Sequence, residues 1–201
     1  MPDLFELRLD RLERCIAEVE IAIDQFPAPF IVTARHPREG GANHLSGPRR
    51  CALLLQFLSG AAYVDVELRS VRPLESVLRS AAQTKVRTII SFHDFEKTPS
   101  GARLDKIASD ARSLGADIVK IATRTDSRAE LDRLLDFFER QRGAGPLAVM
   151  GMGKLGRASR RELARRGSVL NYAHLGSPIA TGQSSVRDLR RELAVPRDAV
   201  S

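Results

Sequence analysis

Short apolar runs alternate with longer amphipathic stretches along the chain. The apolar runs have the length of strands, and the stretches between them repeat their apolar residues at helical spacing. Seven runs are predicted as strands: Leu4–Leu9, Phe30–Ala34, Ala61–Leu68, Val86–Phe92, Asp117–Ala122, Leu147–Gly151 and Ser168–Tyr172. Helices are predicted at Leu12–Phe26, Arg49–Ser59, Pro73–Thr84, Gly101–Leu114, Arg128–Arg142 and Ser159–Arg166, with one more after Gln183.

This alternation predicts the fold class. Each strand and its helix take about 30 residues, the size of a βαβ building block. Strands that alternate with helices favour an all-parallel sheet. Seven such units in succession favour a (β/α) barrel over an open sheet, and no linker-like or low-complexity segment interrupts them. The sequence therefore predicts an α/β protein, with one (β/α) TIM-type barrel domain over residues 1–201.

Polar residues occur late in five of the predicted strands. Residues two apart on a strand point to the same side, and such pairs are Glu6/Arg8, Thr33/Arg35, Asp65/Glu67, Ser91/His93 and Ile118/Lys120. Each pair contains at least one charged or titratable member in an otherwise apolar run. Barrel enzymes keep their sites at the carboxyl ends of the strands, so the pattern predicts a polar catalytic pocket there.

Charge and composition exclude several classes of partner. The formal charge of +7 raises the question of nucleic acid. The densest basic stretch, Lys154 to Arg166, has no aromatic residue on which bases stack, so a solvated helix face and no nucleic-acid partner are predicted. No apolar stretch approaches the ~20 residues that span a bilayer, and the amino terminus lacks a secretory signal, so no membrane partner is expected. Cys15 and Cys51 have no CxxC partner, which is typical of a reduced, cytoplasmic protein.

Lys120 and His93 are the strongest catalytic candidates. Lys120 lies between two apolar residues near the end of a strand, where shielding favours a neutral amine that attacks a carbonyl. The alternative is a structural lysine paired with a carboxylate, but strand interiors rarely contain lysine. His93 is a proton carrier because its ordinary pKa of ~6.5 lies near working pH. The alternative is a core histidine whose hydrogen bonds are satisfied within the protein. The position of His93, one strand before Lys120, favours the catalytic interpretation.

Three more residues are candidates on weaker grounds. Glu39 lies in a loop whose Gly40–Gly41 pair lets it fold over the pocket, although a lone loop glutamate is more often solvated. Arg35 and Arg160 each have the geometry to bind a carboxylate, although either alone is more typical of an ion pair or a surface residue. The four histidines form no metal-binding pattern, and no GxGxxG or P-loop is present, so no metal or nucleotide cofactor is expected.

The chain resembles type I 3-dehydroquinate dehydratase through motifs in family order: ELRLD, TARHPREGG, YVDVELRS, SFHDFEKTP, GADIVKIATR, MGMGKLGRASR and GQSSVRDLR. The resemblance covers essentially the whole chain. It implies a (β/α) barrel that dehydrates 3-dehydroquinate, a small carboxylate, to 3-dehydroshikimate in the shikimate pathway without a cofactor. By this resemblance the Schiff-base lysine is Lys120, the general acid and base is His93, and the carboxylate that assists it is Glu39. Substrate contacts fall on Glu6, Arg8, Arg35, Arg160 and Gln183.

The sequence departs from the family pattern in ways that bear on substrate binding and on the barrel. Ile179 stands where the family usually has a substrate-contacting serine, so weaker binding by the segment Ile179–Gln183 is expected. The family's first strand and helix are also missing, because ELRLD normally belongs to the second unit. An incomplete barrel would leave Leu4–Leu9 and Ser168–Tyr172 facing a gap, and exposed strand edges favour association, here as a homodimer.

Two other functions remain open from the sequence. One is another Schiff-base lyase or aldolase on the same barrel, but paired arginines suit a carboxylate better than a phosphate ester. The other is a non-catalytic binding protein that retains the pocket. The intact set of Lys120, His93 and Glu39 argues against the second, and Ile179 argues for it.

Overall fold

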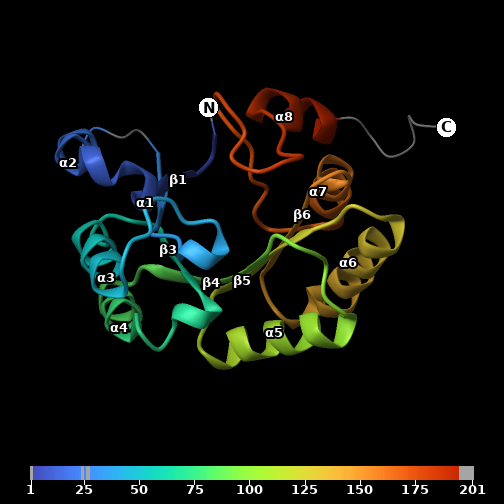
Figure 1. The fold of residues 1–201 in the computed structure, drawn as a ribbon, viewed down its shortest axis with the longest axis horizontal. Coiled ribbons are helices and arrows are strands. Elements are labelled where there is room, and N and C mark those ends of the chain that lie inside the picture. Colours follow the sequence, from blue (N-terminus) through green and yellow to red (C-terminus); the bar gives the residue numbers. More distant parts are fainter. Residues whose placement is uncertain (1, 24, 26–27, 195–201) are drawn as a thin grey trace. The chain divides into compact units, whose positions relative to one another are not determined.

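The computed structural model describes residues 2–23, 25 and 28–194 and is drawn as a ribbon in Figure 1. Contacts between residues divide the chain into two compact units. Unit 1 comprises Met1–His93 and Asp110–Asp117, and unit 2 comprises Asp94–Ser109 and Ile118–Ser201. Helix α5, Gly101–Ser113, is shared between them. No helix among the described residues is long and apolar enough to cross a membrane.

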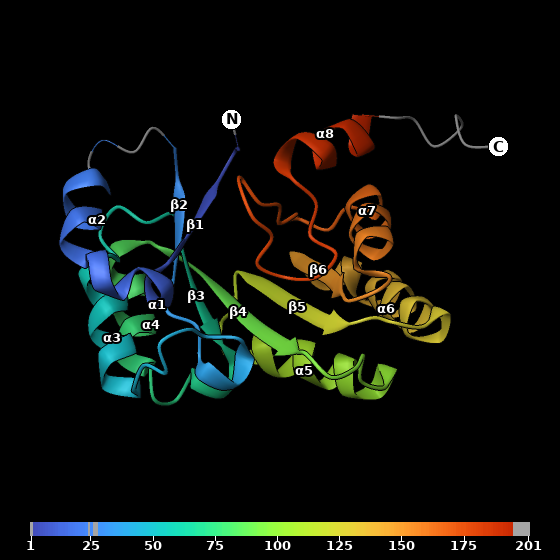
Figure 2. The ribbon, with the colours of Figure 1, turned by 45° about the horizontal axis from the view of Figure 1, so that its top comes forward.

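Unit 1 is built on parallel strands that neighbour one another in chain order. They are β1 Phe5–Arg8, β2 Phe30–Thr33, β3 Tyr63–Glu67 and β4 Arg87–Asp94. The connecting helices are α1 Leu9–Leu12, α2 Ile16–Ile23, α3 Gly47–Gln56 and α4 Glu75–Thr84, with short 3₁₀ turns η1 Glu13–Cys15, η2 Pro37–Glu39 and η3 Leu68–Ser70. In Figures 1 and 2, α3 and α4 lie along one side of β2 and β3.

The burial of unit 1 follows from its sequence pattern. Every residue of β2 and β3 is buried, as expected for strands of a parallel sheet that is covered on both faces. Helix α3 begins where the Ser46 hydroxyl accepts a hydrogen bond from Arg49 N, with Pro48 in the first turn. Helix α4 ends at Lys85, which has a left-handed conformation with φ 60°. The Ser46 cap thus fixes where α3 begins, and the left-handed Lys85 fixes where α4 ends before β4.

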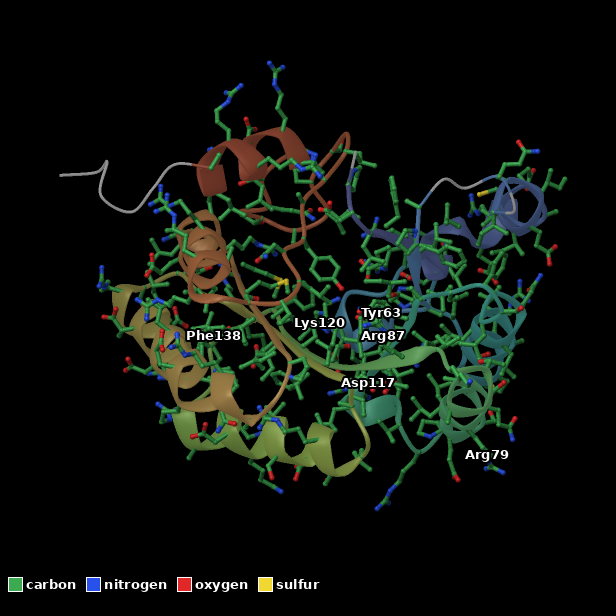
Figure 3. The ribbon with its side chains drawn as sticks, turned by 180° about the vertical axis from the view of Figure 1, so that it is seen from behind. Tyr63, Arg79, Arg87, Asp117, Lys120 and Phe138 are labelled. Atoms are coloured by element: carbon green, nitrogen blue, oxygen red, sulfur yellow. The ribbon has the colours of Figure 1, made fainter. Side chains whose placement is uncertain are left out.

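Unit 2 contains two long parallel strands, β5 Ile118–Arg124 and β6 Leu147–Met152. Its helices are α6 Arg128–Gln141, α7 Gly156–Arg166 and α8 Val186–Ala194, with the 3₁₀ turn η4 Arg142–Ala144. Helix α6 begins with a capping box between Ser127 and Glu130, and it buries Phe137 and Phe138 fully. Phe138 is labelled in Figure 3. Helix α8 confirms the helix predicted after Gln183, and residues 195–201 lie outside the described residues.

The predicted strand Ser168–Tyr172 is wrong, whereas the other six predicted strands are confirmed. Val169 N donates to Leu147 O at 3.1 Å, which is a single ladder bond beside β6. Side chains take the neighbouring positions of the ladder: Val149 N donates to the Ser168 hydroxyl at 3.0 Å, and Asn171 Nδ2 donates to Ser168 O at 3.1 Å. Because these groups are already paired, the ladder is not extended.

The predicted helix Leu12–Phe26 is divided in the structure. It consists of α1, the turn η1 and α2, so that the helical segment begins at Leu9 and its last described helical residue is Ile23. Phe26, where the prediction ended, lies outside the described residues. None of the residues of α2 is buried, and Ile21 is among the most exposed large apolar residues. Burial therefore does not hold this segment in one continuous helix.

Candidate active site

The loop after β2 turns a glutamate back into unit 1. Turn η2 begins at His36, whose Nδ1 accepts a hydrogen bond from Arg38 N at 3.0 Å, and Pro37 occupies the first turn. It ends at Gly40, which has a left-handed conformation with φ 81°. The reversal buries the Glu39 side chain, although this residue belongs to a connecting loop.

Glu39 and His93, both predicted as site residues, are in direct contact. Glu39 Oε2 accepts a hydrogen bond from His93 N at 3.0 Å and lies 3.0 Å from His93 Nδ1. Burial, together with the nearby negative charge of Glu67, raises the pKa of Glu39 to about 7. The cations of Arg35 and Arg69 act in the opposite direction. A carboxylate with a pKa near neutrality, in contact with an imidazole, is suited to general acid–base chemistry.

The loop that contains Glu39 is fixed at both ends, which differs from the movable loop that its two glycines predicted. Arg35 N and Ala42 N both donate to the Asp10 carboxylate, at 3.2 and 2.8 Å. Gly41 N donates to His36 O at 3.0 Å. A Cβ atom on Gly41 would lie 2.1 Å from Arg35 O, so this glycine allows two backbone segments to pack closely.

We expect Gly41→Ala to destabilise the protein and lower its turnover. The added methyl group overlaps the Arg35 carbonyl, so the loop has to shift and Glu39 separates from His93. Overpacking of this kind costs about 1–3 kcal/mol, which lowers the Tm by a few degrees. Thermal unfolding and steady-state rates measure both effects.

Gly143→Ala is the matched control, because a Cβ atom there meets nothing within 4 Å. It should leave the Tm and the rate unchanged. A Gly41→Ala protein with the Tm and the rate of the control would show that the close backbone approach is not required.

Arg35 is surrounded by carboxylates of unit 1. Its guanidinium forms a two-point ion pair with Asp65 at 2.8 and 2.9 Å, and Nη1 also donates to Ser91 Oγ at 2.7 Å and to Glu67 at 3.3 Å. Burial lowers the pKa of Arg35, but Asp65 and Glu67 outweigh this effect and hold the pKa well above its ordinary value. The structure thus directs the donors of Arg35 toward protein groups.

Glu6 and Arg8 both belong to β1, and Arg8, its last residue, contacts the loop that contains Glu39. Glu6 Oε1 accepts a hydrogen bond from Thr33 Oγ1 at 2.9 Å and lies 3.6 Å from Arg35 Nη2. Arg8 donates to the Asp10 carboxylate at 2.8 and 2.9 Å and to Gly40 O at 3.1 Å. Unit 1 therefore gathers Glu6, Arg8, Arg35, Glu39 and His93 from separate strands and loops.

Lys120 lies inside unit 2, in the middle of β5 (Figure 3). The prediction placed it near the end of its strand, but β5 continues to Arg124. Lys120 is 3% exposed, and its Nζ lies 4.0 Å from the centroid of the Tyr172 ring. Close by in unit 2, Tyr172 packs against Met150 and Met152. The amine thus has an aromatic face beside it, an arrangement that holds a lysine head group in place.

Arg160 is a buried cation that donates hydrogen bonds to backbone carbonyls. It is 8% exposed, and its Nε and Nη1 donate to Gly151 O at 3.0 Å and to Tyr172 O at 3.1 Å. Burial lowers the pKa of Arg160 to about 10, so it is charged at neutral pH. Among the described residues it forms no ion pair with a carboxylate. Its remaining N–H groups are therefore suited to an anionic ligand.

The segment 179–183 packs against the connection between β6 and α7. Gly153 N donates to Thr181 O at 3.1 Å, and Gln183 Oε1 accepts a hydrogen bond from Ile179 N at 2.9 Å. A Cβ atom on Gly182 would lie 2.8 Å from Gly156 Cα, so the two backbones touch. A hollow of about 300 Å³ opens here, lined by Phe95, Arg124, Asp126, Met152, Gly153, Lys154, Ile179, Ala180 and Thr181.

Comparison with known proteins identifies the family of the chain. The model of a family described as type I 3-dehydroquinase matches residues 1–198. The chain belongs to the type I 3-dehydroquinase family. The 3-dehydroquinate dehydratase of Thermococcus gammatolerans is 36% identical over 195 residues, which cover 96% of this chain and 87% of that protein. The enzyme of Methanococcus vannielii is 34% identical over 195 residues, with 95% and 87% covered.

Solved structures of type I 3-dehydroquinases and related dehydratases agree with this assignment. The 3-dehydroquinate dehydratase of Geobacillus kaustophilus superposes with a TM-score of 0.86 and 30% identity, covering 96% of this chain and 80% of that chain. The type I enzyme of Clostridium difficile, solved with covalently modified comenic acid, gives 0.85 and 28%, with 95% and 80% covered. The predicted fold class, an α/β protein of the TIM-barrel type, and the predicted function class, a hydro-lyase, are confirmed.

Three residues of this type I 3-dehydroquinase that contribute to the site were not singled out from the sequence. Asp10 fixes the Glu39 loop, and its signal was a charged residue directly after an apolar strand. Tyr172 lies against Lys120, but in sequence it belonged to a predicted strand without a role. Arg69 contacts Glu39, and nothing in the local pattern distinguishes it from a solvated arginine.

Proposed function

We propose that this chain dehydrates 3-dehydroquinate to 3-dehydroshikimate, a step of the shikimate pathway, through a Schiff base on Lys120. The observation that carries the proposal is the buried Lys120 amine against Tyr172, in a chain of the type I family. The amine adds to the substrate ketone and water leaves, which gives an iminium. The iminium withdraws electrons and acidifies the adjacent C–H group.

His93 moves the protons of the elimination. It removes the proton from the acidified carbon, and it then protonates the departing hydroxyl, which leaves as water. Water finally hydrolyses the product iminium and restores the lysine. Glu39 holds the imidazole through Nδ1 at 3.0 Å, so that the other ring nitrogen is presented to the substrate. The raised pKa of Glu39, about 7, is suited to a pair that both accepts and donates protons.

Arg160 binds the substrate carboxylate in this proposal. It is buried and charged, and no carboxylate of the described residues pairs with it, so an anion removes an electrostatic cost of burying this cation. Arg35, the other arginine predicted for this role, is already neutralised by Asp65 and Glu67. Arg35 instead supports the substrate site by fixing Glu6, and the substrate hydroxyls bind to Glu6, Arg8 and Gln183.

Three further properties belong to the same proposal. The catalytic domain comprises residues 1–201. The protein works in the cytoplasm, which its free cysteines, Cys15 and Cys51, support. It associates as a homodimer, an arrangement favoured by β1, which is half-buried throughout and among the described residues pairs with β2 alone.

An ultraviolet assay tests the proposed function. The product contains a conjugated enone that absorbs where the substrate does not, so purified protein mixed with 3-dehydroquinate should produce a rising signal. A phosphorylated hydroxyketone in place of 3-dehydroquinate tests the aldolase alternative. Turnover of the phosphate ester alone would establish another Schiff-base lyase. Binding of 3-dehydroquinate without turnover would establish a binding protein and overturn the proposal.

Ile179→Ser is expected to lower KM and to leave kcat nearly unchanged. Ile179 is 52% exposed, lines the hollow of unit 2 and presents no polar side-chain atom to a substrate. A hydroxyl adds a hydrogen bond of about 1 kcal/mol, which corresponds to a several-fold lower KM. Leu175→Ser is the control, since Leu175 is also exposed but does not line the hollow. A KM for Ile179→Ser equal to that of the control, or higher than wild type, would contradict the expectation.

A further inference from the structure

An arginine from turn η3 covers the buried carboxylate of Glu39. Arg69 follows the buried end of β3, and its Nε lies 2.8 Å from Glu39 Oε1. The Arg69 side chain is 43% exposed, whereas that of Glu39 is 2% exposed. The guanidinium therefore reaches from the solvent onto a carboxylate that is otherwise enclosed.

The two oxygens of Glu39 have different partners. Oε1 contacts Arg69, and Oε2 accepts a hydrogen bond from His93 N and contacts His93 Nδ1, both at 3.0 Å. Arg69 and the imidazole thus act on the same carboxylate from opposite ends. A change in the charge of Arg69 reaches His93 through one shared group.

Charged residues from several elements of unit 1 act on Glu39. Glu67 on β3 opposes its ionisation, and Arg35 after β2 favours it. Glu67 is itself paired with Arg50, and Arg35 is paired with Asp65. In the described part of the chain, Glu39 forms ion pairs with two groups only, Arg69 and His93.

We propose that Arg69 is a positioning residue of the dehydration, which favours the ionised form of Glu39 and orients it so that His93 acts as a base. Arg69 touches Glu39 and acts through it. The inference rests on the proposed function, since it assumes that His93 transfers the proton. It adds a residue that lies outside the set predicted from the sequence.

The sign of the effect follows from the charge. A cation next to a carboxylate stabilises the ionised form, so loss of Arg69 favours protonation of Glu39. The Glu39–His93 pair then holds its last proton more tightly, and the acidic limb of the rate profile moves to higher pH. Above that limb the pair is deprotonated with or without Arg69, so the rates converge there.

The experiment compares the pH profile of kcat/KM for Arg69→Gln, Arg69→Lys and wild type. Arg69→Gln should move the acidic limb upward by about half to one pH unit, because the ion pair is partly exposed to solvent. That shift lowers kcat/KM about 3–10-fold on the acidic side. Arg69→Lys, which keeps the charge, should restore most of the wild-type profile. Arg72→Gln, an exposed arginine three positions along, should match wild type.

An NMR titration of the His93 imidazole in the resting protein separates this inference from the proposed function. Absence of turnover in wild type would overturn the proposed function, whereas the titration of His93 still reports on Arg69. An upward shift in Arg69→Gln that Arg69→Lys reverses supports the inference. A wild-type titration in Arg69→Gln overturns it. A rate that falls equally at all pH values also overturns it, because that result indicates a merely structural role.

Discussion

Lys120→Ala is expected to lower turnover by several powers of ten while substrate binding remains partly intact. The covalent route disappears with the amine, whereas the groups that bind the carboxylate and the hydroxyls stay in place. Because Lys120 is 3% exposed, its removal also leaves a cavity. Lys120→Met retains most of the packing of the side chain, so equal losses in the two variants assign the effect to the amine.

Steady-state rates and calorimetric binding of 3-dehydroquinate measure the two parts of this expectation. Lys97→Ala serves as the control, since Lys97 is an exposed lysine of the same unit. Near-normal turnover in Lys120→Met would show that another group forms the covalent bond, or that the reaction proceeds without one.

His93→Ala is expected to lower kcat by ~10²–10⁴-fold, the typical contribution of general acid–base catalysis. The imine still forms in this variant, but proton removal stops, so the iminium accumulates during the reaction. Mass spectrometry of the intact protein after reduction measures this accumulation. The step that His93 controls is thereby distinguished from the step that Lys120 controls.

His44→Asn is the matched control for His93→Ala. His44 has a left-handed conformation with φ 46°, which asparagine tolerates, and it is an exposed loop residue. It should retain the wild-type rate. If His93→Ala also retained that rate, a different base would have to remove the proton.

The strands that were predicted most closely have a sequence pattern that is typical of a fully buried strand. Phe30–Thr33 and Tyr63–Glu67 are apolar or β-branched for most of their length and are buried on both faces, so their pattern does not depend on a particular neighbour. Ser168–Tyr172 has a similar pattern but no strand. The conformation of this segment depends on two side-chain contacts. Ser168 pairs with Val149, which is distant in the sequence, and Asn171 pairs with Ser168 O in a local turn.

The candidate site was predictable where chemistry alone singles out a residue. His93 was named from its residue type and position. Glu39 was assigned its role only through the resemblance to the type I family, and the structure joins the two residues at 3.0 Å. Arg35 was predicted to contact the substrate. The sequence alone does not show that Arg35 forms an ion pair with Asp65 of β3. No sequence feature near Arg69 predicted its contact, because its partner Glu39 lies in the loop after β2, distant in the sequence.

Borohydride trapping tests the central claim, a Schiff base on Lys120, most directly. Borohydride added while the protein turns over 3-dehydroquinate reduces the iminium to a stable secondary amine. Mass spectrometry of the digested protein then locates the ligand. A Schiff base on Lys120 predicts a substrate-derived mass increase on the peptide that contains Lys120, and none when 3-dehydroquinate is omitted. Label on a different lysine, or no label despite turnover, would contradict it.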